Sequence, residues 1–163
     1  MIRAAGLAAT LAVGLGTGAW GADDQHCAPD AITLNADGGP VVFSVEIADD
    51  AAEHSRGLMF RPELAREAGM LFLYDVPRPA AFWMRNTMIP LDMIFIDDAG
   101  LVLNIEADAQ PYTETPRRSE GPVRAVLEIN GGLSAELGIG PGTQAVHPAF
   151  RGAPEEHLCA APS

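Results

Sequence analysis

The apolar residues of this chain recur mainly with a period of two, which is the spacing of β-strands. Residues 41–47 alternate between apolar and polar side chains and predict a half-buried strand. The unbroken apolar run at residues 93–96 is instead typical of a strand that is buried on both faces. Similar patterns predict further strands at residues 70–74, 80–84, 91–96, 101–107, 123–129 and 144–147.

Two helix-start signals interrupt the strand pattern. Asp50 is followed three residues later by Glu53, which predicts a capping box and a short helix that ends at Gly57. Pro62 suits the first turn of a helix and predicts a second short helix that ends at Gly69. These helices would lie between the first strands of the chain.

The order of these elements predicts a mainly β fold, a single compact antiparallel β-sandwich or open barrel with two or three short helices. A hairpin turn is expected at residues 97–100 and a helical piece at residues 133–137. Residues 110–122 form a long polar connection, which is either a plain surface loop or a flap over a binding site. With 163 residues and an apolar fraction of 48%, the chain has room for one domain.

The first residues have the pattern of an export signal. Met1-Ile2-Arg3 precedes the apolar run 4–19, and small residues follow, so residues 1–22 are predicted to be a signal peptide. An uncleaved membrane anchor is less favoured, because the run is short and rich in Gly and Ala. We therefore expect a periplasmic or secreted protein without stable membrane insertion, in which residues 30–148 form the domain and residues 149–163 an irregular tail.

Cys27 and Cys159 lie near the two ends of the predicted mature chain. In an exported protein, two cysteines predict a single disulfide. Closing so long a loop would contribute on the order of 4 to 5 kcal/mol in the chain-entropy model. The alternative is a metal site made by these two cysteines with His26 and His157, which oxidation of the thiols would prevent.

Composition narrows the possible functions. The net charge of -12 and a pI near 4.5 repel phosphate backbones, so nucleic acid is not an expected partner. All ten basic residues are Arg, which excludes Schiff-base chemistry and a lysine nucleophile.

Several short motifs, in order along the chain, carry a resemblance to a known family. They are Arg56–Met59, Gly69–Phe72, the run Phe82–Asp97, Val126–Glu128 and Gly138-Ile139. Over roughly residues 41–147 the chain resembles the bacterial and archaeal family known as domain of unknown function 192. The resemblance implies a compact β-rich fold and no established reaction.

The chain departs from the family pattern at two positions. Arg85 stands where family members usually carry Lys, which keeps the charge but changes the donor geometry. Thr143 follows Gly142 where the family tends to have Asp, so no role for that Asp carries over.

The usual catalytic motifs are absent from the sequence. It contains no Gly-x-Ser-x-Gly elbow, no His-Glu-x-x-His and no glycine-rich phosphate loop, so no catalytic residue, cofactor or metal is predicted. His54, on a short predicted helix, is interpreted as a solvated surface residue.

What remains is a set of polar and aromatic residues within strongly apolar segments. The predicted ligand-binding set is Arg56, Arg61, Trp83, Arg85, Asn86, Thr87, Asp92 and Glu128. Strand alternation puts Glu128 on the face opposite Leu127, where it could line a concave surface with Trp83 and Tyr74 as flat walls. The structural alternative is that arginines pair with Asp92 or Glu128 to neutralise buried charge.

The sequence therefore favours a module that binds an unknown small polar ligand or a protein partner, rather than an enzyme. Two alternatives remain open. A hydrolase could use Asp92 and Glu128 as an acid and base pair. A periplasmic copper-binding protein could use thioethers, although ordinary core packing also explains most of the five candidates, Met59, Met70, Met84, Met88 and Met93.

Overall fold

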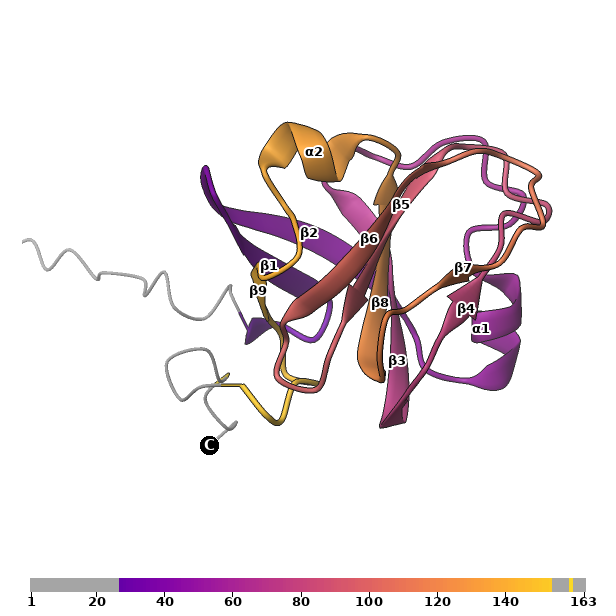
Figure 1. Ribbon diagram of the computed structural model, residues 1–163. Helices are drawn as coiled ribbons and strands as arrows, with labels where there is room; N and C mark the ends of the chain where they lie inside the picture. Colours follow the sequence, from indigo (N-terminus) through magenta and orange to yellow (C-terminus); the bar gives the residue numbers. More distant parts are fainter. Residues whose placement is uncertain (1–26, 154–158, 160–163) are drawn as a thin grey trace, which may run out of the picture.

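A curled seven-stranded sheet dominates the computed structural model, which describes residues 27–153 and residue 159 (Figure 1). The strand order is β6-β5-β8-β3-β2-β1-β9, and β4 and β7 form a separate two-stranded sheet. The strands are β1 (Ala31–Ala36), β2 (Gly39–Ala48), β3 (Ala68–Arg78), β4 (Ala81–Phe82), β5 (Leu91–Ile96), β6 (Val102–Ala109), β7 (Arg117–Arg118), β8 (Val123–Asn130) and β9 (Gln144–Val146). The helices are α1 (Ala51–Arg56) and α2 (Leu133–Leu137).

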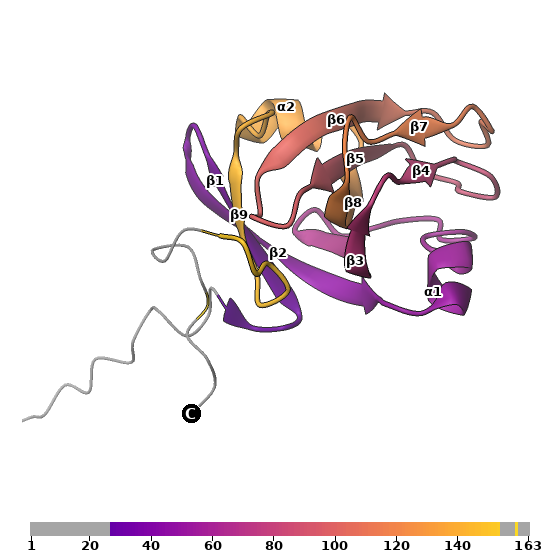
Figure 2. The same ribbon diagram turned by 60° about the horizontal axis from the view of Figure 1, so that its bottom comes forward.

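The predicted fold class is confirmed: the protein is mainly β, with a half-barrel sheet and two short helices. The strand pairs of the large sheet are antiparallel except β2 with β3, which α1 connects in parallel. In both views, α1 and the β4–β7 pair lie at one end of the molecule, away from α2 and β1 (Figures 1 and 2).

Both faces of the central strands are buried. All six residues of β5 are buried, including the unbroken apolar run 93–96, for which the sequence predicts burial on both faces. Ile94 and Leu127 belong to one core cluster, while Met93, Phe95 and Val126 belong to the other, on the opposite face. The cluster with Met93, Phe95 and Val126 also contains Phe72, which lines a cavity on this face of the sheet.

The capping box predicted at the start of α1 is present. The Asp50 side chain accepts hydrogen bonds from the amides of Ala52 and Glu53, each at 2.8 Å. The Glu53 carboxylate in turn accepts from the Asp50 amide at 3.4 Å. The helix ends at Gly57, as predicted, where φ is 47°.

The second helix predicted in this region, from Pro62 to Gly69, does not form. A helix would need the carbonyls of Leu64 and Ala65 to accept hydrogen bonds from amides four residues later. Instead the Ala65 carbonyl accepts from the Ala68 amide, only three residues later, at 3.0 Å, and the side-chain Nδ2 of Asn130 donates to both carbonyls at 3.1 Å. This tertiary contact with β8 holds the segment in an irregular path.

The long connection at residues 110–122 carries β7, which pairs with β4. Ser119 reinforces this pairing, because its Oγ accepts from the Ala80 amide at 2.9 Å and its amide donates to the Ala80 carbonyl at 3.0 Å. Of the strand predicted at residues 80–84, only Ala81 and Phe82 form β4.

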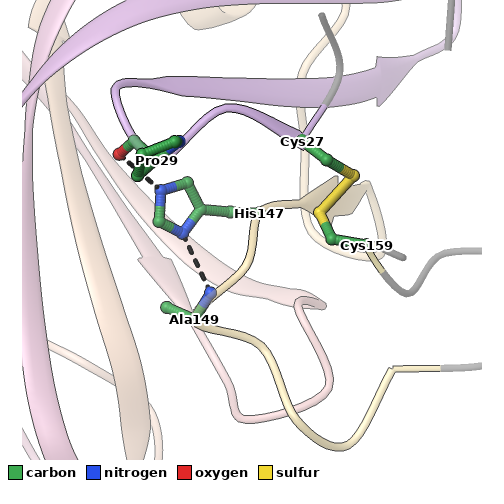
Figure 3. Close-up of a disulfide and its surroundings, with 5 residues drawn as sticks. All are labelled: Cys27, Pro29, His147, Ala149 and Cys159. Atoms are coloured by element: carbon green, nitrogen blue, oxygen red, sulfur yellow. Dashed lines mark hydrogen bonds between the residues drawn. A yellow bond between two sulfur atoms is a disulfide. The ribbon is translucent and has the colours of Figure 1, made fainter. Parts of the chain in front are cut away.

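The ends of the described chain lie close together (Figure 3). The predicted disulfide between Cys27 and Cys159 is present, with the two Cα atoms 5.3 Å apart. Nearby, buried His147 links both segments: its Nε2 donates to the Pro29 carbonyl at 3.1 Å, and its Nδ1 accepts from the Ala149 amide at 3.1 Å.

The predicted signal peptide, His26 and His157 lie outside the described residues. Among the residues that are described, no helix is long and apolar enough to cross a membrane.

Candidate functional site

Glu128 is the buried acid on the cavity side of the sheet. It lies in the middle of β8 with 4% of its surface exposed, on the same face as Val126. Within the described part of the chain, its carboxyl group has no hydrogen bond and no ion pair. Burial alone raises its pKa to about 8, so the group is mostly protonated at neutral pH.

Glu128 lines a cavity of about 280 Å³ that opens between α1, β3, β4 and β8. The cavity is lined by His54, Ser55, Arg56, Gly57, Leu58, Met59, Phe72, Tyr74, Arg78, Ala81, Phe82, Trp83, Thr87 and Glu128. Four of the eight predicted ligand-binding residues are among them, namely Arg56, Trp83, Thr87 and Glu128.

Aromatic side chains supply much of the cavity wall. The rings of Phe72 and Phe82 meet edge to face with centroids 4.9 Å apart, and Phe95 continues the contact from the core at 6.2 Å. Trp83 stands nearer the solvent and is 49% exposed. The cavity therefore offers flat apolar ring surfaces beside polar side chains such as Glu128.

His54 is not the solvated residue that the sequence suggests. Its ring packs edge to face against Tyr74 at 5.1 Å, and its Nε2 lies 2.9 Å from the Ala48 carbonyl. Because a carbonyl only accepts, Nε2 carries a proton, and in the neutral ring Nδ1 is the acceptor. The sequence gives little signal for this placement, since Tyr74 and Ala48 come from different strands.

Tyr74 lies where β3 is irregular, and Arg124 compensates for the interrupted strand pairing. The pairing between β3 and β8 shifts between Leu73 and Arg78. Buried Arg124 donates through Nη1 to the Tyr74 carbonyl at 2.8 Å and to the Asp75 carbonyl at 2.5 Å. These bonds satisfy backbone acceptors that the strand ladder leaves free and fix the Tyr74 end of β3.

Burial is also the main reason why the pKa of the Tyr74 hydroxyl is raised. The nearby Arg78 guanidinium, 4.9 Å from the centre of the Tyr74 ring, opposes this shift.

Gly57 leaves room beside Glu128. A Cβ atom at this position would lie 3.1 Å from Cζ of Phe72 and 3.9 Å from Oε2 of Glu128. The positive φ of 47° also favours glycine. The residue that ends α1 therefore keeps the cavity open next to the acid.

Asp92 lies on the opposite face of the sheet from Glu128. Its carboxylate accepts four hydrogen bonds: from the amides of Asp108 (2.7 Å), Gly132 (2.8 Å) and Ser134 (2.8 Å), and from the Ser134 hydroxyl (2.6 Å). Asp92 is therefore a structural acceptor that joins β5 to the start of α2. The expectation that an arginine neutralises Asp92 or Glu128 is wrong, because none pairs with either carboxyl group in the described region. The acid and base pair of the hydrolase alternative is not formed either.

The other predicted site residues do not line this cavity. Arg61 pairs with Glu46 through two hydrogen bonds, and Arg85 stacks on Trp83 at 5.9 Å. Asn86 has a left-handed backbone, with φ 55°, and its Nδ2 lies 3.9 Å from the Met59 sulfur.

The five methionines do not form one surface cluster. Met70, Met84 and Met93 are buried in the core, Met59 lines the cavity, and Met88 is 43% exposed. In the described region no group of three or more His, Cys, Asp or Glu residues is placed to hold a metal ion.

Fold and site together define a class of protein: a curled β domain with a cavity that aromatic side chains and a buried acid line. The chain belongs to the family described as Uncharacterized ACR, the domain of unknown function 192, whose family model matches residues 32–147.

Two crystal structures are similar to the chain. A protein of unknown function from Novosphingobium aromaticivorans is 53% identical, with a TM-score of 0.69 over 71% of this chain and 82% of that one. A protein from Sinorhizobium meliloti, described as a candidate transcription regulator, is 38% identical, with a TM-score of 0.68 over 71% of this chain and 90% of that one. No curated protein matches the chain.

Proposed function

We propose that this protein is an exported binding module that holds a small organic ligand in the cavity between α1, β3, β4 and β8. The observation that carries the proposal is Glu128, a buried carboxyl group without a partner among the described residues. Its carboxyl oxygens are not sealed in the core but remain accessible from the cavity, where a ligand can reach them. A ligand in the cavity would supply the missing partner, and binding sites commonly contain groups that folding alone does not favour.

The state of Glu128 suits binding of a ligand. With a pKa of about 8, the carboxyl group is protonated at neutral pH, so it can both donate and accept a hydrogen bond. The rings of Phe72 and Phe82 supply apolar wall beside the many polar side chains that line the cavity, a combination that suits a ligand with both an apolar body and polar groups.

Export to the periplasm or the medium is supported from both ends of the chain. Residues 1–22 have the pattern of a signal peptide. The disulfide between Cys27 and Cys159 suits an oxidising compartment.

Nucleic-acid binding is not part of the proposal, although one relative is described as a candidate transcription regulator. This chain has 22 acidic and 10 basic residues, so its net charge opposes contact with phosphate backbones.

A thermal-shift screen of small molecules on the mature protein tests the proposal, because a ligand that prefers the folded state raises its stability. A ligand at 100 times its Kd adds about 2.7 kcal/mol. Hits should stabilise wild type and lose most of their effect on Glu128→Leu, which fills the floor of the cavity with an apolar group. Glu106→Leu, in β6 and outside the cavity, is the matched control and should respond like wild type. Hits that stabilise all three proteins equally, or no hits at all, would contradict the proposal.

A further inference from the structure

Two arginines that line the cavity form no ion pair with an acidic side chain of the described region. Five arginines of the described region form ion pairs: Arg61, Arg66, Arg85, Arg117 and Arg124. Four others, Arg56, Arg78, Arg118 and Arg151, form no ion pair within residues 27–153, and of these Arg56 and Arg78 line the cavity. Two guanidinium groups without counter-ions therefore lie at one site.

No ionised carboxylate balances them there at neutral pH. Among the described residues, Glu128 is the only acidic one that lines the cavity, and burial keeps it mostly protonated. The chain as a whole has a net charge of -12. An acidic protein thus presents a positively charged cavity, an arrangement that selects for negative charge in a ligand.

The walls indicate what else the ligand contains. Phe72, Phe82 and Trp83 offer ring surfaces, and the volume of about 280 Å³ suits a molecule of roughly one ring with substituents rather than a large cofactor. Arg78 already lies over the Tyr74 ring, 4.9 Å from its centre, which holds the guanidinium at the cavity edge.

We propose that the ligand is a small organic anion. Its flat or apolar body lies against Phe72, Phe82 and Trp83, and its charged group faces Arg56 and Arg78. Glu128 donates a hydrogen bond to an acceptor of the ligand at the cavity floor. The inference rests on the proposed function, since it specifies the ligand class of the same cavity.

Three probes of similar shape and different charge test the inference: benzoate, benzamide and benzamidine. Each is titrated into the mature protein at pH 6.5 and low salt, and the amide resonances of cavity residues are followed by NMR. Benzoate should bind about tenfold more tightly than benzamide, a difference equivalent to 1.4 kcal/mol. Added salt should reduce this preference, because the charges are near the surface. Acetate, which lacks the ring, should bind more weakly than benzoate.

Substitutions assign the preference to the two arginines. Arg56→Gln and Arg78→Gln should each weaken benzoate binding about threefold, so that the two together account for the tenfold preference, and should change benzamide binding less. Arg78→Lys should retain much of the preference, because it keeps the charge. Arg118→Gln is the matched control, since Arg118 also lacks an ion pair in the described region but does not line the cavity.

The outcomes separate the inference from the proposed function. Equal binding of benzoate and benzamide at the cavity, or tighter binding of benzamidine, would overturn the inference that the ligand is an anion. The proposal that the cavity binds a ligand would still stand. The same holds if none of these probes binds but the thermal-shift hits do bind there. If neither the probes nor the screen perturbs the cavity, both are overturned.

Discussion

At the scale of single residues, two buried acids of the same sheet have opposite roles. Asp92 accepts four hydrogen bonds, whereas Glu128 has no partner in the described region. The sequence already favours this division, because Asp92 follows Pro90-Leu91 at a turn exit and Glu128 lies in mid-strand. The sequence does not reveal the partners of Asp92, because Gly132 and Ser134 are distant in the chain and only the tertiary packing of α2 brings them to Asp92.

For Asp92→Asn we expect a loss of stability on the order of 3 kcal/mol, because the amide replaces one acceptor oxygen by a donor that faces backbone N–H groups. Urea melts of the variant and wild type measure the difference. Asp75→Asn, at an exposed position of β3, is the control and should change the midpoint little. A wild-type midpoint for Asp92→Asn would contradict the structural role.

For Glu128→Gln we expect increased stability at pH 8. The carboxyl group has a pKa of about 8 in the folded protein and 4.5 as its ordinary value. Between these values the folded state holds a proton that the unfolded state has lost, so wild-type stability falls as pH rises through this window and then levels off. Glutamine has no such proton, and the variant should gain on the order of 3 kcal/mol over wild type at pH 8.

Urea melts of both proteins at pH 5 and pH 8 measure this effect. The other titratable and charged groups that face the cavity, His54 and Arg56 from α1 and Tyr74 and Arg78 from β3, are present in both proteins. Their contributions therefore cancel in the comparison. A constant difference between the two proteins across this range would show that Glu128 ionises normally.

At the scale of elements, the loops beside the cavity contain backbone strain. Phe60 and Tyr112 have left-handed backbones, with φ 63° and 60°, although their side chains are exposed. The Phe60 amide donates to the Asn86 carbonyl at 2.9 Å and the Tyr112 amide to the Thr87 carbonyl at 3.3 Å. Both loops are thus tied to residues 86 and 87, the second of which lines the cavity, and strain of this kind is frequent near functional sites.

For Tyr112→Gly we expect greater stability than for Tyr112→Ala by about 1 kcal/mol, because only glycine adopts the left-handed conformation without steric cost. The two variants lose the same aromatic side chain, so the comparison isolates the backbone. Thermal melts measure it. Equal stability, or a more stable alanine variant, would show that the loop relaxes instead of storing strain.

The elements also show how far the sequence predicts this fold. Strong local patterns, such as the capping box at Asp50 and the apolar run of β5, form as predicted. The strand β1 was not predicted, although Ile32 and Leu34 alternate with more polar residues and lie fully buried in the core. The failed helix after Pro62 and the cavity itself depend on contacts between distant segments, such as Asn130 with Leu64, which no local pattern encodes.

At the scale of the whole molecule, the first and last described segments of the chain are joined to each other. β1 pairs with β9, placing Thr33 opposite Val146, and His147 adds a hydrogen bond to Pro29. The disulfide joins residues 132 positions apart in the sequence. The cavity lies at the other end of the molecule, beside α1 and the β4–β7 pair (Figures 1 and 2). We therefore expect the bridge to affect global stability and not the shape of the cavity.

Peptide maps of the exported protein should contain one Cys27 to Cys159 linkage that disappears on reduction. Reduction should lower the urea midpoint, because opening a loop of this length releases conformational entropy of the unfolded chain, on the order of 5 kcal/mol as an upper value. The double variant Cys27→Ser, Cys159→Ser should melt like the reduced protein and respond to no reductant. Cavity ligands should bind the oxidised and reduced proteins with equal affinity, since the bridge is remote from Glu128. Two free thiols in the exported protein, or identical melts before and after reduction, would show that the paired strands alone hold the ends of the domain.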